Sequence, residues 1–78
     1  MTNLEKYDAV FCEILNLKES QLTGLKYQDI PEWDSVGHMS LVASIEEAFD
    51  IMMETDDIID LSSYEKGKEI LKKYKIEI

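Results

Sequence analysis

The sequence predicts an all-α protein, a small bundle of three main helices plus one short helix. Apolar residues recur at three- and four-residue steps in three separate segments, and no segment alternates like a strand. Apolar residues make up 45% of the 78 residues, whereas glycine and proline number only three and one. This composition supplies a core and disfavours extended disorder. We expect residues 1–78 to form a single domain, because a chain of this length seldom divides.

The first main helix is expected over residues 3–17. Thr2 and Asn3 are residue types that commonly cap a helix N-terminus. Cys12 is the only cysteine, which excludes an internal disulfide and a cysteine-based zinc site, and we expect it to be a packed side chain of this helix. The apolar stripe of the helix consists of Leu4, Tyr7, Val10, Phe11, Ile14 and Leu15.

From Lys18 to Trp33 the helical periodicity disappears, and Gly24 and Pro31 interrupt the chain. A connection of this length without secondary structure tends to be functional or to cover a core. We expect it to cover the core, because it contains four scattered apolar residues: Leu22, Leu25, Tyr27 and Ile30.

The second main helix is expected over residues 35–50, with Asp34 or Ser35 as its cap. At 100° per residue, Leu41, Ile45 and Phe49 fall on one line, which is the expected core face. A second apolar ladder lies opposite that line, bordered by polar and acidic residues. We expect this ladder and its border to bind partner proteins. The expected docking residues are Val36, Met39, Ser40, Ala43, Glu46, Glu47 and Asp50.

A short helix is expected over residues 56–60, capped by Thr55 or Asp56, and a last main helix over residues 63–75, capped by Ser62 or Ser63. The apolar face of the last helix carries Tyr64, Gly67, Ile70, Leu71 and Tyr74, and most of its lysines fall on the other side.

The formal net charge is −9, from 17 acidic and 8 basic residues. Such a charge disfavours nucleic acid as a partner, because phosphates would be repelled, and favours partners with basic surfaces. The stretch between Lys26 and Lys66 contains many acids and no Lys or Arg. No apolar run approaches the length of a membrane span and no signal segment is evident, so we expect a cytoplasmic protein. We also expect it to be a monomer.

Ser35 draws attention because it stands at the expected start of a helix without an evident catalytic base. The free N–H groups and the helix dipole at that position favour a phosphate attached there. A capping serine is also a common structural device, so position alone does not separate the two roles.

The stretch "WDSVGHMSLVASIEEAFDI", from Trp33 to Ile51, resembles the Asp-Ser-Leu segment and acidic recognition helix of acyl carrier proteins. The resemblance covers the whole chain, because the opening helix, the long loop, the acidic "ETDDIIDL" and the closing helix follow in the order typical of that family. It implies an acyl-carrier-protein-like bundle in which Ser35, preceded by the motif residue Asp34, is the attachment point for phosphopantetheine. It further implies a phosphopantetheinyl transferase, acting with coenzyme A and magnesium, as one partner. Magnesium would serve that transferase and not this chain, for which we expect no metal site.

The resemblance implies a stand-alone carrier that holds acyl groups as thioesters and presents them to acyl-loading and acyl-transfer enzymes of a fatty-acid, polyketide or specialised pathway. Four residues depart from the usual pattern: Val36 replaces the leucine after the serine, Gly37 and His38 replace polar, helix-favouring residues, and Ser40 stands where fatty-acid carriers often have an acid. The departures resemble carriers of accessory pathways.

Other functions remain open from the sequence. The cargo could be aminoacyl or peptidyl, and an acidic helical adaptor without any modification would have the same periodicity and charge. An esterase that uses His38 as the base for Ser35 is disfavoured, because no third residue orients the histidine and no Gly-x-Ser-x-Gly elbow is present. Calcium binding between Asp50 and Asp60 is disfavoured because Met52 and Met53 interrupt the acids and the central glycine of an EF-hand loop is missing.

Overall fold

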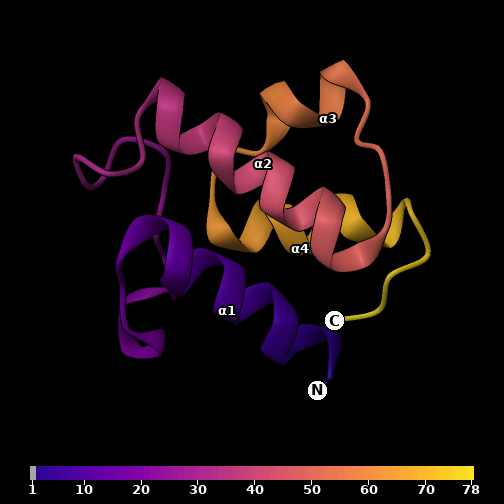
Figure 1. Cartoon of the computed structure of the whole chain (residues 1–78), viewed down its shortest axis with the longest axis horizontal. Coiled ribbons are helices and arrows are strands. Elements are labelled where there is room, and N and C mark those ends of the chain that lie inside the picture. The colour runs from indigo at the N-terminus through magenta and orange to yellow at the C-terminus, as the bar shows by residue number, and fades with distance from the viewer. Residues whose placement is uncertain (1) are drawn as a thin grey trace.

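Four α-helices make up the fold in a computed structural model that describes residues 2–78. They are α1 (Asn3–Leu15), α2 (Ser35–Phe49), α3 (Thr55–Asp60) and α4 (Tyr64–Lys72). Within residues 2–78 no strand forms, and the predicted all-α class with three main helices and one short helix is confirmed. Figure 1 shows α1 and α2 side by side, with α3 beyond α2 and α4 behind it. No helix in residues 2–78 has the length and apolar character needed to cross a membrane.

Helix α1 begins as expected and ends two residues early. The Thr2 hydroxyl accepts a hydrogen bond from the Glu5 N–H, and the Glu5 carboxylate accepts one from the Thr2 N–H, which forms a capping box. The helix ends at Leu15 because Asn16 adopts a left-handed conformation with φ 56°. Cys12 is half-buried against the core, as predicted, and burial raises the pKa of its thiol.

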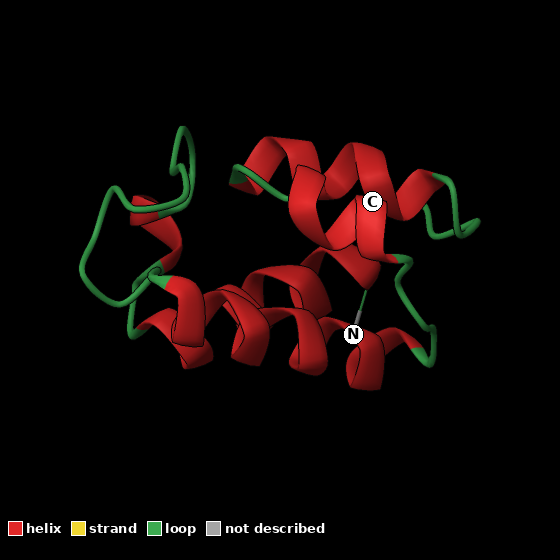
Figure 2. Cartoon of the chain, turned by 90° about the horizontal axis from the view of Figure 1, so that it is seen from above, coloured by secondary structure: helices red, strands yellow, loops and turns green. Residues whose placement is uncertain are grey.

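The long loop between α1 and α2 is better ordered than the sequence indicates. It contains a 3-10 turn at Glu19–Gln21 and an isolated β-bridge between Lys26 and Ser63. The Tyr27 N–H donates to the Ser62 carbonyl and the Tyr64 N–H donates to the Leu25 carbonyl, so the loop is tied to the start of α4. It covers the core as predicted, because Leu22 and Leu25 are buried. Figure 2 shows this loop at one end of the helices.

Helix α4 and its cap largely match the prediction. The Ser63 hydroxyl accepts a hydrogen bond from the Lys66 N–H, and the helix ends at Lys72 instead of 75. The predicted cap of α3 by Thr55 or Asp56 is wrong, because α3 begins after Glu54 and no side chain caps it.

The core is built around aromatic rings in tilted and edge-to-face contacts. Phe11 lies 4.8 Å from Tyr7, 5.4 Å from Tyr64 and 5.6 Å from Trp33, measured between ring centroids. The Tyr7 hydroxyl donates to the Tyr64 carbonyl over 2.6 Å, which satisfies a buried polar group. A Cβ at Gly67 would lie 2.0 Å from the Tyr7 hydroxyl oxygen, so glycine is needed where α4 meets α1. The aromatic side chains thus hold α1, the loop and α4 together.

A buried carboxylate connects α3 to the end of α4. Asp57 is 2% exposed, and its two oxygens accept hydrogen bonds from the Lys73 ammonium and the Tyr74 hydroxyl. The hydrogen bond from Lys73, followed by that from Tyr74, lowers the pKa of Asp57. Asp57 therefore stabilises the fold and is not part of the acidic surface that the sequence indicated.

Candidate functional site

Ser35 occupies the first turn of α2 with an exposed side chain. Its Oγ lies 3.3 Å from the hydroxyl oxygen of Tyr27, a residue of the long loop. The preceding residue, Asp34, is the true cap of α2, because its Oδ1 accepts a hydrogen bond from the Gly37 N–H over 2.8 Å. Of the two caps that the sequence allowed, Asp34 is the correct one. The Ser35 hydroxyl is therefore left accessible and has no capping role.

His38 does not serve Ser35 as a base. Its Nδ1 accepts a hydrogen bond from the Trp33 indole Nε1–H over 3.0 Å. Because that indole is only a donor, Nδ1 must be unprotonated, so the proton lies on Nε2 and is donated to the Ile58 carbonyl oxygen over 2.8 Å. Both ring nitrogens are thus engaged away from the serine. This geometry places the histidine at the edge of the core and argues against an esterase.

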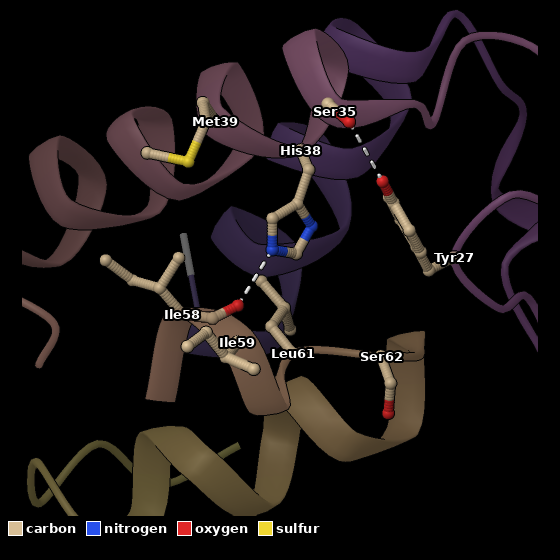
Figure 3. A pocket seen from close by; sticks show the side chains of 8 residues that line it. All are labelled: Tyr27, Ser35, His38, Met39, Ile58, Ile59, Leu61 and Ser62. Atoms are coloured by element: carbon tan, nitrogen blue, oxygen red, sulfur yellow. Dashed lines mark hydrogen bonds between the residues drawn. The ribbon is translucent and has the colours of Figure 1, made fainter. Parts of the chain in front are cut away.

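A groove of about 340 Å³ opens beside Ser35, between the first turns of α2 and helix α3. Figure 3 shows the Ser35 and Tyr27 hydroxyls pointing toward one another on one side of His38, with Met39 and Ile59 on the other side. The volume is near the lower end of the range of ligand sites, about 300–1,000 Å³. The lining residues are Tyr27, Ser35, His38, Met39, Ile58, Ile59, Leu61 and Ser62.

Gly37 has a structural reason to be glycine. A Cβ built there would lie 2.0 Å from the Glu32 carbonyl oxygen and 3.1 Å from its carbon, which are backbone atoms that cannot rotate away. The glycine therefore lets the end of the long loop approach the first turn of α2. This close approach places Asp34 and Ser35 at the start of the helix.

Most of the expected docking residues form an exposed surface on α2. Val36 and Met39 are 76% and 54% exposed, although both are apolar. The remaining exposed members are Ser40, Ala43, Glu47 and Asp50. We call these six residues the α2 outer face.

Glu46 departs from the expected role. It is half-buried, and its Oε2 accepts a hydrogen bond from the Met53 N–H over 2.8 Å. The carboxylate therefore holds the segment between α2 and α3. The prediction that Glu46 belongs to the exposed docking surface is therefore wrong.

No family model matches the chain, and neither the curated proteins nor the solved structures give a match. The resemblance to acyl carrier proteins thus depends on the residues of the sequence. In residues 2–78, no cluster of three or more His, Cys, Asp or Glu side chains is arranged to hold a metal ion.

Sequence reasoning missed the side of the groove that α3 and the loop provide. Tyr27 appeared only as a loop anchor, and Ile59, 72% exposed, was not assigned to any surface. A signal for Ile59 was present, because Ile58 and Ile59 are neighbours in a six-residue helix and cannot both face the core. The sequence gives no signal that Tyr27 lies beside Ser35, because the apolar residues of the loop do not recur at a regular spacing.

Proposed function

We propose that this chain is a carrier protein that holds acyl intermediates as thioesters on a phosphopantetheine arm attached to Ser35. One observation carries the proposal above the others: the Ser35 hydroxyl is exposed at the mouth of a groove and has no capping role, because Asp34 caps the helix. A serine whose only role was to cap the helix would accept a hydrogen bond from a backbone N–H of the first turn, and Ser35 does not.

The residues around Ser35 fit such an arm. A phosphate on the serine would lie at the N-terminus of a helix of 15 residues, where the dipole and the first N–H groups favour a negative charge. The Tyr27 hydroxyl lies beside Ser35 and can donate a hydrogen bond to such a phosphate, and the groove offers apolar side chains farther along. When attached, the arm supplies a terminal thiol on which an acyl group is carried as a thioester.

The chain needs a separate enzyme for the modification, because His38 is engaged by Trp33 and Ile58 and is not available to activate Ser35. A phosphopantetheinyl transferase would join the Ser35 oxygen to phosphorus, with the adenosine bisphosphate half of coenzyme A as the leaving group. The α2 outer face is the surface on which that transferase and the acyl-transfer enzymes dock. Its acids attract basic patches, and Val36 and Met39 supply apolar contact.

Intact-protein mass spectrometry tests the proposal. The chain is incubated with coenzyme A, magnesium and a broad-specificity phosphopantetheinyl transferase. The expected result is a gain of one phosphopantetheine group per chain, with no gain in Ser35→Ala. An unchanged mass of the wild-type chain would remove the basis of the carrier function.

An unmodified helical adaptor is the second candidate, and the exposed apolar side chains favour it. Met52 and Ile59 are 86% and 72% exposed, in addition to Val36 and Met39. Such residues suit the burial of a partner surface without any covalent group. The same experiment separates the two candidates, because an adaptor would keep its mass.

A further inference from the structure

His38 closes the groove beside Ser35 on the side that faces the core. Its imidazole extends from α2 to the Ile58 carbonyl of α3, so a side chain fills the space between these helices (Figure 3). The ring centroids of His38 and Tyr27 lie 5.3 Å apart, and those of His38 and Trp33 lie 6.3 Å apart. The histidine is thus held by two hydrogen bonds and two ring contacts.

The side chains behind His38 are the buried aromatic rings of the core. Trp33 is fully buried and contacts Phe11, which in turn contacts Tyr7 and Tyr64, and all of these rings are at most 6% exposed. A chain that entered the bundle from the groove would have to displace His38 from both hydrogen bonds. The indole N–H would then be buried without a partner, which is an unfavourable state.

The groove itself changes character along its length. The hydroxyls of Tyr27, Ser35 and Ser62 lie at one end, whereas Met39, Ile58 and Ile59 lie at the other (Figure 3). An arm attached to Ser35 would start at the polar end. Much of the 340 Å³ would be taken by the arm, so little apolar surface remains for the group that it carries.

We propose that His38 is a specificity-determining residue that keeps cargo out of the helical bundle, so that this carrier shelters only short acyl groups, which rest against Met39, Ile58 and Ile59. The inference depends on the proposed function, because it requires an arm on Ser35. A long acyl chain has no place here: its entry is closed by His38, and outside the groove it would remain in water.

Trp33 makes the inference testable, because it is the only tryptophan and its indole N–H is bonded to His38. The full chain is loaded by a broad-specificity transferase from butyryl-, octanoyl- and hexadecanoyl-coenzyme A, and loading is verified by intact mass. Two-dimensional ¹H–¹⁵N NMR then records the indole signal and the backbone amides. We expect an unchanged indole signal for all three acyl groups, and shifted amides at Met39 and Ile59 with the butyryl group.

Two variants at the same position provide the matched comparison. In His38→Ala the route is open, so the octanoyl chain should shift the indole signal relative to the unloaded variant. In His38→Gln the side-chain amide offers an acceptor for Trp33 and a donor for Ile58, so the indole signal should stay unchanged on loading. If His38→Ala is unfolded, the wild-type chain and His38→Gln still provide the test.

The outcomes separate the two proposals. A shift of the wild-type indole signal with octanoyl or hexadecanoyl cargo would overturn the role of His38, while the mass of the loaded chain would leave the carrier function standing. If no acyl group attaches to the folded wild-type chain, the carrier function itself fails, and the inference fails with it. An indole signal unchanged in loaded His38→Ala would also contradict the role of His38.

Discussion

The indole Nε1–H of Trp33 donates a hydrogen bond to Nδ1 of His38 over 3.0 Å. This bond joins the end of the long loop to α2, and the second ring nitrogen of His38 extends the connection to Ile58 in α3. Trp33 is fully buried, so His38 supplies the hydrogen-bond acceptor that its indole N–H needs. His38 thus fastens three segments around Ser35.

Replacing His38 by alanine should destabilise the protein. The variant leaves the buried indole N–H without an acceptor, which costs about 1–3 kcal/mol in the free energy of unfolding. Urea denaturation followed by tryptophan fluorescence measures the change. The matched variant His38→Gln should lose less than His38→Ala, because it retains an acceptor and a donor. Equal stability of His38→Ala and the wild type would show that the bond contributes nothing.

Asp34 and Ser35 should differ in what they contribute to stability. Asp34→Ala removes the oxygen that accepts from the Gly37 N–H, so it should lower the free energy of unfolding by about 0.5–2 kcal/mol. Ser35→Ala should stay within about 0.5 kcal/mol of the wild type, because Ser35 is exposed and does not cap the helix. Thermal and urea unfolding of the two variants decide the matter, and a larger loss in Ser35→Ala would reverse the assignment of the cap.

Asp57 should make the fold sensitive to acid. The hydrogen bonds from Lys73 and Tyr74 lower the pKa of Asp57 in the folded protein below its unfolded value of about 4. Its stabilising contribution is therefore present above about pH 4 and is lost as the pH falls through the folded-state pKa. Unfolding measured between pH 7 and pH 2 should show a steeper acid loss in the wild type than in Asp57→Asn. The exposed Asp56→Asn serves as the control and should retain the wild-type profile.

Glu47 should influence how fast the transferase acts on Ser35. It is exposed on the α2 outer face, and a basic enzyme surface would be attracted to it over about 8–10 Å at moderate ionic strength. Glu47→Lys should slow modification at low salt, and the difference should shrink as salt is added. The initial rate of mass gain is the measurement.

Glu69→Lys provides the matched charge change for that rate. Glu69 lies on α4 and makes only an exposed ion pair with Lys66 at 3.7 Å, so its replacement should cost little stability. If Glu69→Lys slows modification as much as Glu47→Lys does, the α2 outer face is not the docking surface. Glu46 is unsuited to this test because its carboxylate bonds the Met53 N–H.

Helix number, order and approximate position could be predicted because they depend on apolar period and capping residues. The caps Thr2 and Ser63 are local signals, and the structure confirms them. Most of the predicted stripes of α1 and α4 are confirmed as well, but Leu4 is 40% exposed and Tyr74 lies beyond the end of α4. Helix ends were less accurate, since the left-handed conformation of Asn16 ends α1 before the apolar pattern does. The loop's bridge to Ser63 pairs residues far apart in sequence, for which no local signal exists.

The candidate site could be predicted only in part, because contacts between residues far apart in sequence have no local signal. The exposure of Val36 and Met39 follows from the helical wheel of α2 and is confirmed. The hydrogen bond that the Met53 N–H donates to Glu46 and the burial of Asp57 depend on tertiary contacts. Both residues have acidic neighbours in the sequence, which suggest an exposed surface. Charge alone does not distinguish an acidic residue that accepts hydrogen bonds within the protein from one that faces solvent.

Locating the modification tests the central claim most directly. After reaction with coenzyme A and the transferase, the chain is digested and the peptides are fragmented in the mass spectrometer. We predict that the phosphopantetheine mass lies on Ser35 and on neither Ser40 nor Ser44, the other serines of α2. Ser35→Ala should yield no modified peptide, and Ser44→Ala, which lies outside the α2 outer face, should yield as much as the wild type. A modification found on another serine, or an unmodified Ser35 in the folded chain, would contradict the account.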